Sequence, residues 1–273
     1  MWIILFRPRI LTNAFNSYFM TVLITGASSG IGCELAKIFA REGYDLVLVA
    51  RRGDRLESLK QLIQTEHSVQ ITTIVQDLSF DGGAEHLFEM LAGRSIDILV
   101  NNAGSGDVGM FVETDPQKTE RMLHLNILSL ASLTRLILPS MIARQSGKIL
   151  NVASIAAFFP GPTMASYFAS KAFVLSFSEA LSNELEGTGV SVTILCPGST
   201  STEFDRAAGS DWGEAYRQKI PRASEVAEFG FSTLMAHKRI AVYGWKNRVL
   251  IFLIRFIPRH VVVRISRVFL SSF

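Results

Sequence analysis

The stretch Thr21-Val-Leu-Ile-Thr-Gly26-Ala-Ser-Ser-Gly30-Ile-Gly32 carries the clearest indication of the fold. Residues 21–25 read as a short buried strand, and an amphipathic helix is predicted from about residue 33 to residue 42. Glycines let a backbone turn approach a pyrophosphate, and the N-terminus of the next helix offers unpaired N–H groups. The spacing G-x-x-x-G-x-G differs from the G-x-G-x-x-G fingerprint. We predict a dinucleotide-binding turn; a plain tight turn is the competing interpretation.

The segments that follow alternate between strand and helix patterns. Strands are predicted at 45–50, 70–76, 96–100, 148–154 and 240–243, with helices at 54–65, from Asp77-Leu78 to Ala92, and at 115–143, 167–186 and 224–238. Such alternation predicts an α/β fold: a single doubly wound, Rossmann-type parallel sheet with helices on both faces. We assign this domain to residues 21–244, between an N-terminal extension (1–20), for which Met20 is an alternative translation start, and a C-terminal tail (245–273).

Composition narrows the class of protein. The chain has 273 residues, 48% of them hydrophobic and 19% charged, which suits one large domain with a substantial core. Cys33 and Cys196 lie far apart without metal-ligand or redox spacing, so a reducing, cytoplasmic compartment is expected. The five histidines are scattered, and we predict no metal site. The first residues form an apolar run too short to span a bilayer, and export is not expected.

The second predicted strand ends in Ala50-Arg51-Arg52, where dinucleotide folds often place an acid that holds the adenosine ribose. Two guanidiniums without an acid suit a 2′-phosphate, because their forked donors match phosphate oxygens. The pattern favours NADP(H) over NAD as cofactor. Two merely solvated arginines are the alternative.

Polar residues also follow the later strands. Asp77 stands just past the third strand, where it accepts from an adenine amine or caps the next turn. Asn101-Asn102-Ala103-Gly104 follows the fourth strand, and its small residues let a cofactor lie close to the backbone, although a generic turn has the same composition. Asn126 sits among apolar residues of the long predicted helix and needs partners. It is either satisfied internally or bonds a kinked helix carbonyl and holds water near Lys171.

Tyr167 and Lys171 lie four residues apart on a predicted helix and therefore share one face. A nearby cation favours the phenolate, which brings the pKa of a tyrosine towards the range of a general acid or base. Ser154 ends a predicted strand, where its hydroxyl is placed to bond the same substrate oxygen. Taken alone, a Tyr and Lys at this spacing occur on many solvated helices.

In order and spacing these motifs resemble the short-chain dehydrogenase/reductase family over about residues 21–243. The matching pieces are Thr25-Gly26-x-x-x-Gly30-Ile31-Gly32, Asp77, Asn101-Asn102-Ala103-Gly104, Asn126, Ser154, Tyr167-x-x-x-Lys171 and Pro197-Gly198. The resemblance implies that Tyr167 is the general acid/base, that Ser154 polarises the carbonyl and that Lys171 binds the nicotinamide ribose and lowers the Tyr167 pKa. It also implies that Asn126 supports a proton relay through water.

The resemblance implies a cofactor site as well. It comprises Gly26, Ser28, Gly30, Ile31 and Gly32 at the pyrophosphate, Arg51 and Arg52 as an NADP-selective pair, Asp77 and Leu78 at adenine, Asn102 on the adenosine side and Thr202 near the carboxamide, together with Ala103, Gly104, Tyr167, Lys171, Pro197 and Gly198. Family members are commonly homodimers or homotetramers joined through the helices that here hold Asn126 and Tyr167.

Three apolar segments are expected around the nicotinamide: 108–112, 155–164 and the region after Gly198 with Phe204, Trp212 and Tyr216. The third, from Ser199 to Pro221, is typical of a lid. Because no segment offers an ion for a charged substrate, we predict a hydrophobic or lipid-like ketone or alcohol. There are two alternatives: these aromatic residues belong to the ordinary hydrophobic core, or the substrate is polar.

The tail carries the basic character of the chain, since residues 229–273 contain Lys and Arg but no Asp or Glu. Its apolar runs, broken by arginines, suit a basic amphipathic helix on an anionic membrane surface, or else pack on the enzyme body or a subunit interface. A nucleic-acid partner is not predicted. The sequence thus predicts an NADP(H)-dependent oxidoreductase; the alternative is an NADP-sensing, membrane-associated regulatory protein without turnover.

Overall fold

The computed structural model of the protein describes residues 20–204, 208–209 and 219–271. Seven strands form one parallel sheet in the order β3-β2-β1-β4-β5-β6-β7. They are β1 (Thr21–Thr25), β2 (Asp45–Ala50), β3 (Ile71–Val75), β4 (Ile98–Asn101), β5 (Gly147–Val152), β6 (Val190–Cys196) and β7 (Ile240–Val242). The predicted doubly wound sheet is confirmed. The proposed N-terminal extension lies, apart from Met20, outside the described residues.

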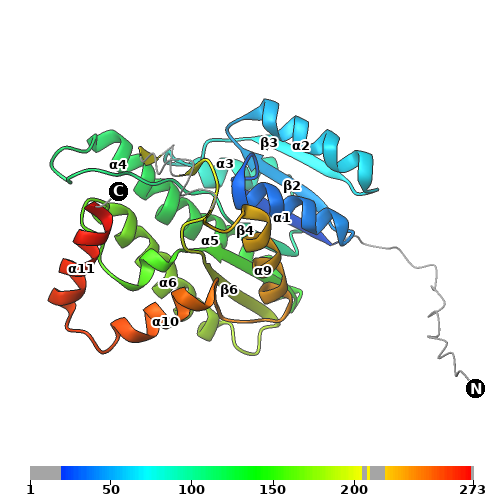
Figure 1. Ribbon diagram of the computed structural model, residues 1–273. Coiled ribbons are helices and arrows are strands. Elements are labelled where there is room, and N and C mark those ends of the chain that lie inside the picture. The colour runs from blue at the N-terminus through cyan, green and yellow to red at the C-terminus, as the bar shows by residue number, and fades with distance from the viewer. Residues whose placement is uncertain (1–19, 205–207, 210–218, 272–273) are drawn as a thin grey trace, which may run out of the picture.

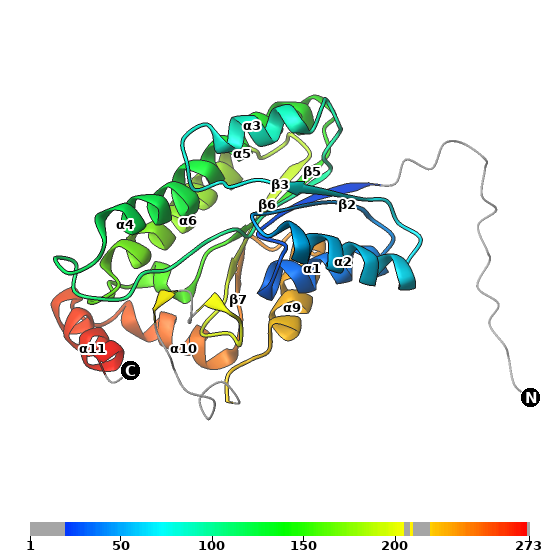
Figure 2. The same ribbon diagram turned by 90° about the horizontal axis from the view of Figure 1, so that it is seen from above.

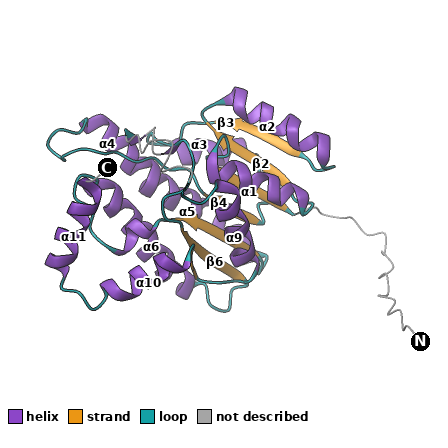
Figure 3. Cartoon of the chain, in the orientation of Figure 1, coloured by secondary structure: helices purple, strands orange, loops and turns teal. Residues whose placement is uncertain are grey.

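Helices cover both faces of the sheet (Figures 1 and 2). One face carries α1 (Gly30–Arg41), α2 (Gly53–Glu66) and α9 (Ala223–Met235), and the other carries α3 (Gly83–Met90), α4 (Pro116–Leu123), α5 (Ser129–Ala143) and α6 (Ala165–Glu184). Figure 3 shows the strands enclosed between these two layers. The layers bury the five strands β1, β2, β4, β5 and β6, which explains why the sequence reads there as apolar runs.

Strand β1 shows how the core is divided. Val22 and Ile24 point into the cluster formed with α1, α2 and α9, whereas Leu23 points into the cluster formed with α3, α5 and α6. All three side chains are fully buried. Successive residues of a strand face opposite sides, so this one strand anchors both layers.

The long helix predicted over residues 115–143 is interrupted, which corrects that prediction. It begins with Asp115, whose side chain accepts from the Gln117 backbone N–H, and it continues as α4. Residues His124–Leu128 then form a π-helical stretch, η1, before α5 begins. A π turn inserts one residue, which hydrophobic periodicity does not reveal.

The combined helix Pro116–Ala143 is, among the described residues, long and apolar enough to cross a membrane by length and composition. Its α5 portion packs Leu133, Ile137 and Met141 against the sheet. These buried contacts are those of a core helix, and the length alone is weak evidence for a membrane span.

The tail forms two helices, α10 (Trp245–Ile254) and α11 (Arg259–Ser271), which follow β7. In Figure 1 they run in orange and red beside α6, and the C-terminus lies at the end of α11. Each helix buries part of one face on the body, through Ile251 in α10 and Val262 in α11.

Candidate active site

A cavity of about 460 Å³ lies at the carboxyl ends of the strands, where the order reverses between β1 and β4. Open parallel sheets bind ligands at this point. Every cofactor and catalytic residue predicted from the sequence lines the cavity except Gly32 and Asn126. The structure therefore brings together segments from residue 26 to residue 204, and it adds the end of the tail helix α11.

The glycine-rich turn after β1 packs tightly against the loop after β4. Gly26 has φ +68°, and a Cβ there would lie 2.8 Å from the Ala103 Cα. At Gly32 a Cβ would lie 2.3 Å from the Asn102 Nδ2. That Nδ2 donates to the carbonyl oxygens of Thr25 at 2.9 Å and Gly26 at 3.2 Å. Gly32 thus acts through close packing behind the cavity, and Asn102 holds the two loops together.

Arg52 lies directly over the glycine-rich turn. Its Nη2 donates to the hydroxyls of Ser28 at 3.1 Å and Ser29 at 2.8 Å. Its Nη1 lies 2.8 Å from a carboxylate oxygen of Glu203, and Arg55 Nη1 lies 2.7 Å from the other oxygen. Hydrogen bonds from Arg55 and then Arg52 lower the pKa of Glu203 below its ordinary value. Two guanidiniums therefore converge on one anionic group beside the turn.

Arg55 and Glu203 belong to this cluster although the sequence did not point to them. The signal for Arg55 was its position in the first turn of α2, close behind the Arg51-Arg52 pair. Glu203 directly follows Thr202, a predicted cofactor residue, but nothing in the sequence indicated its pairing with Arg55, which is 148 residues away along the chain.

Arg51 and Asp77 occupy the neighbouring edge of the cavity. Their closest nitrogen and oxygen atoms are 3.7 Å apart. Asp77 also accepts from the backbone N–H and the hydroxyl of Ser79, at 2.8 and 2.7 Å. The carboxylate therefore caps the turn after β3, as one alternative predicted, and it lines the cavity together with Leu78.

Ser154 lies two residues beyond the end of β5, at the start of the 3₁₀ turn η2 (Ile155–Phe158). Its Oγ accepts from the Ala156 backbone N–H at 3.1 Å and donates to the Pro197 carbonyl at 3.4 Å. The first bond orients the side chain. The second is long, and the hydroxyl proton can rotate from it towards a ligand oxygen.

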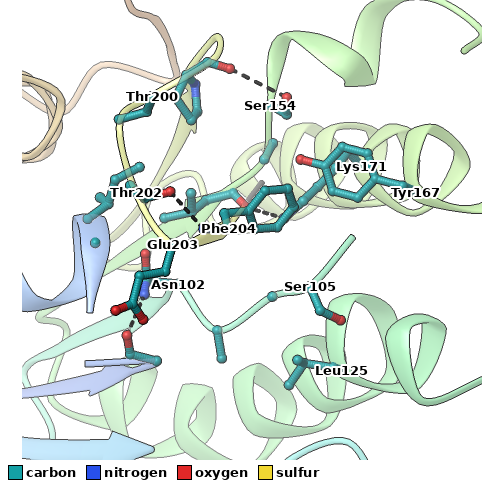
Figure 4. A pocket seen from close by; sticks show the side chains of 18 of the residues that line it. Asn102, Ser105, Leu125, Ser154, Tyr167, Lys171, Thr200, Thr202, Glu203 and Phe204 are labelled. Atoms are coloured by element: carbon teal, nitrogen blue, oxygen red, sulfur yellow. Dashed lines mark hydrogen bonds between the residues drawn. The ribbon is translucent and has the colours of Figure 1, made fainter. Parts of the chain in front are cut away.

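Tyr167 and Lys171 project from neighbouring turns of α6 into the cavity, across from Asn102 and Glu203 (Figure 4). The Lys171 Nζ lies 5.9 Å from the centre of the Tyr167 ring and donates to the Val152 carbonyl at 2.9 Å. Lys171 is only 5% exposed, and desolvation lowers its pKa to about 8. An ammonium has three N–H donors, so this group can bind further oxygens in the cavity.

Asn126 comes from the π-helical stretch and lies behind the cavity wall. Its Oδ1 accepts from the Ser105 N–H, and its Nδ2 donates to the Ser105 carbonyl and to the Ser170 hydroxyl, at 2.9 to 3.0 Å. The amide is therefore satisfied internally, as one alternative predicted. Ser170 in turn donates to the Tyr167 carbonyl at 2.7 Å, which links Asn126 to the helix of the catalytic pair.

The side of the cavity away from the arginines is apolar. It is lined by Ile155, Ala156, Phe159, Met164, Phe168, Phe204, Phe269 and Leu270. The second predicted substrate segment (155–164) and Phe204 thus reach the cavity. Segment 108–112 does not line it, and Phe111 and Val112 are exposed, which corrects that expectation. Trp212 and Tyr216, with most of the predicted lid, lie outside the described residues.

Comparisons with known proteins agree with this geometry. The family model described as short chain dehydrogenase matches residues 20–212. The 17-beta-hydroxysteroid dehydrogenase type 3 of Homo sapiens is 36% identical over 201 residues, which cover 72% of this chain and 65% of that protein. A very-long-chain 3-oxoacyl-CoA reductase of Phaeosphaeria nodorum is 39% identical over 176 residues, covering 62% of this chain and only 52% of the reductase.

A solved structure shares the fold closely. The short-chain dehydrogenase from Sphingobium yanoikuyae in complex with NADPH superposes with a TM-score of 0.78 at 34% identity, covering 83% of this chain and 89% of that one. The family match spans more than half of the chain and includes the glycine-rich turn, Ser154, Tyr167 and Lys171. This protein therefore belongs to the short-chain dehydrogenase family, whose members are oxidoreductases acting on C=O and CH–OH groups.

Proposed function

We propose that the protein is an NADPH-dependent reductase of a hydrophobic, lipid-like ketone. The observation that carries the proposal is the meeting of Ser154, Tyr167 and Lys171 in one cavity with the glycine-rich turn and the arginine cluster. A proton donor and a nucleotide cradle are thereby adjacent, as hydride transfer with protonation requires.

The residues present fit a dinucleotide with a 2′-phosphate. Gly26 and Gly30 line the cavity at the N-terminus of α1, whose backbone N–H groups can bind a pyrophosphate. Arg52 and Arg55 already hold a carboxylate at the end of β2, and a phosphate can take the place of that carboxylate. This cluster supports NADP(H) over NAD. Lys171, nearly buried at the other end, fits the ribose hydroxyls beside the reacting carbon.

NADPH supplies the hydride when it is bound. Tyr167 gives its phenolic proton to the carbonyl oxygen, and the neighbouring Lys171 charge stabilises the phenolate that remains. Ser154 donates a hydrogen bond to the same oxygen and so holds the carbonyl as negative charge develops on it. Asn126 and Ser170 are positioning residues, because they act on the backbone around Ser105 and Tyr167.

The substrate class rests on the apolar wall of the cavity. Phe159, Met164, Phe168 and Phe204 surround the space beyond Tyr167, and the Phe204 ring packs 5.5 Å from the Tyr167 ring. Such a wall favours apolar groups on the substrate. The names of the relatives, a hydroxysteroid dehydrogenase and a very-long-chain 3-oxoacyl-CoA reductase, point to the same chemistry.

The direct test is the consumption of NADPH or NADH with matched panels of aliphatic, acyl-thioester and steroid-like ketones. We expect turnover with NADPH and the apolar ketones. Tight NADPH binding without turnover of any panel member would instead favour the nucleotide-sensing alternative. Tighter binding of NADH than of NADPH would overturn the cofactor assignment.

The proposal includes a homo-oligomer working in the cytoplasm. Its support is apolar surface on the helices that hold the site: Leu128 is exposed, and so is Phe173, whose ring stacks on Phe177 at 5.6 Å. Exposed apolar side chains on long helices suit a subunit interface. Light scattering of the protein and of the Phe173→Asp variant checks it; a wild-type monomer at micromolar concentration contradicts it.

A further inference from the structure

Helix α10 presents an apolar stripe to the outside of the molecule. Trp245, Val249 and Phe252 follow each other at intervals of four and three residues, and Phe256 continues the row just beyond the helix. Trp245 is 68% exposed, Phe252 57% and Phe256 71%. Residues at these intervals lie on one face of a helix, so the side chains form one continuous surface.

The opposite face of α10 fixes the helix on the enzyme. Ile251 is buried there, and Asn247 donates from Nδ2 to the Tyr243 carbonyl at 2.8 Å. A Cβ on Gly198 would lie 2.7 Å from the same Nδ2, so α10 packs directly behind the Pro197-Gly198 loop of the cavity. The helix cannot roll to hide its stripe without losing these contacts.

Basic side chains flank the stripe. Lys246, Arg248 and Arg255 are exposed on α10 and the turn after it. Arg259, Arg264 and Arg267 continue the positive surface along α11, and residues 229–273 contain no Asp or Glu. An apolar stripe between cations matches the headgroup region of an anionic lipid bilayer. A second copy would instead bring like charges together, which opposes a symmetric contact through this face.

The same helix pair reaches the cavity. The chain leaves α10, turns at Pro258 and returns as α11 (Figure 1). Phe269 and Leu270 near the end of α11 line the cavity. α10 also packs against η2, the turn that begins after Ser154. The outward surface and the apolar cavity wall therefore belong to one structural unit.

We propose that the α10 stripe rests on an anionic lipid surface and that the hydrophobic ketone enters the cavity from that surface past the end of α11. The second part rests on the proposed reductase function, whereas the first part does not. A carbonyl compound dissolved in the lipid then reaches Tyr167 without crossing water. Binding combines burial of apolar side chains with attraction to anionic headgroups, so it weakens as salt increases.

Flotation of the full chain with vesicles tests the surface. The vesicles contain equal parts phosphatidylcholine and phosphatidylglycerol, or phosphatidylcholine alone. We expect binding to the anionic vesicles. The double variant Phe252→Ser, Phe256→Ser should partition at least about tenfold more weakly, a change that corresponds to roughly 1.4 kcal/mol of lost apolar burial from the two rings together. The control pair Phe88→Ser and Met90→Ser, also exposed but on α3, should bind like wild type.

Three outcomes overturn the surface assignment: no vesicle binding by wild type, unchanged binding by the stripe variant, or a dimer in light scattering that only the stripe variant loses. NADPH affinity, measured on every variant, shows that the fold is intact. Charge reversal at Lys246→Glu and Arg255→Glu should remove the preference for anionic vesicles.

Kinetics test the entry route. The stripe variant should lose turnover of a long-chain ketone held in the anionic vesicles, yet keep wild-type turnover of a short water-soluble ketone. The entry route is overturned if the stripe variant loses turnover equally with both ketones, or if it loses turnover with neither. If wild type turns over no ketone, the proposed function fails while the flotation result still stands on its own.

Discussion

Lys171 carries its charge in a buried place that disfavours it. Its burial lowers the pKa to about 8 from 10.5, so between these values the unfolded chain binds more protons than the folded one. Unfolding free energy therefore rises with pH in that window, and below pH 8 the full cost of the buried charge is present. Buried groups with strongly shifted pKa values are concentrated at functional sites, which agrees with a role for the Lys171 charge in binding a ligand.

The first prediction concerns NADPH affinity against pH. We expect the affinity of wild type to fall as pH rises through about 8, because the neutral amine loses its attraction for the anionic cofactor. Fluorescence titration over this range measures the dissociation constant. The Lys171→Met variant should bind more weakly below pH 8 and show no such inflection. A wild-type curve without an inflection of its own contradicts the prediction.

A second prediction separates proton transfer from binding. Tyr167→Phe should lower kcat/KM by about 10² to 10⁴, the usual contribution of a positioned general acid. Its NADPH affinity should stay close to that of wild type, because the ring and its packing against Phe204 are kept. Steady-state kinetics and titration measure the two effects. Tyr44→Phe, whose hydroxyl contacts Met235 away from the cavity, is the control; near-normal turnover in Tyr167→Phe refutes the assignment.

Glu203 supports a third prediction because its carboxylate occupies both Arg52 and Arg55. A 2′-phosphate must displace it, whereas NADH has no such group. Glu203→Gln should therefore tighten NADPH binding by roughly two- to fivefold, the range of an exposed ion pair, and leave NADH binding unchanged. Parallel titrations with both cofactors measure this difference.

Removing an arginine of this cluster should have the opposite effect on NADPH binding in the same assay. Arg55→Ala should weaken NADPH binding by about tenfold while NADH is unaffected, as expected for a lost charge-assisted hydrogen bond. Glu225→Gln, which alters a carboxylate paired with Arg222, is a matched control for Glu203. Equal changes for NADPH and NADH would show that the cluster does not read the phosphate.

At the scale of elements, the interrupted helix α4-η1-α5 shows what local patterns can predict. Apolar periodicity indicated a helix and placed Asn126 in its middle. The π turn at His124–Leu128 is held by contacts with residues distant in the sequence, since Asn126 bonds Ser105 in the loop after β4 and Ser170 in α6. The apolar periodicity of a segment does not reveal such partners, because they come from other parts of the chain.

For the other elements too, the prediction was good where the signal is local and poor where it comes from distant contacts. The runs at β1 and β2 were predicted with the bounds that the structure has, because both are apolar and end in clear turn signals. Strand β6 was not predicted, although Pro197-Gly198 after it was recognised by resemblance. The catalytic side chains came from motifs with short internal spacing. The pairing of Glu203 with the arginines and the place of Leu270 in the cavity came only from the folded chain, because their partners lie far away in the sequence.

The π turn leads to a fourth prediction. Asn126→Leu leaves the N–H and carbonyl of Ser105 and the Ser170 hydroxyl without their present partner, so unfolding free energy should fall by about 2 to 4 kcal/mol. Ser170→Ala removes two bonds, the one that it accepts from Asn126 and the one that it donates to the Tyr167 carbonyl, and should cost about 1 to 2 kcal/mol. Urea unfolding measures both. A loss no larger for Asn126→Leu than for Ser170→Ala would show that the amide does not hold this loop.

At the scale of the whole molecule, the site is shared between the two ends of the described chain. The sheet and its first helices provide the nucleotide cradle, α6 provides Tyr167 and Lys171, and α11 returns at the end of the chain to complete the apolar wall. The catalytic groups take their positions from the sheet, the turn η2 and α6, with Asn126 of η1 bonded behind them. The shape of the substrate space depends in addition on the tail.

Leu270→Ser tests that division. Leu270 lines the cavity from α11, so replacing its side chain removes apolar contact with large substrates while the arginine cluster and Tyr167 stay in place. We expect KM for a bulky apolar ketone to rise by roughly five- to tenfold, at about 0.8 kcal/mol for each lost carbon group that touched the substrate. KM for a small ketone and the NADPH dissociation constant should not change. Val263→Ser, on the exposed side of the same helix, is the control. If KM changes equally in both variants, or equally for both ketones, then α11 contributes to the stability of the protein and not to the shape of the substrate space.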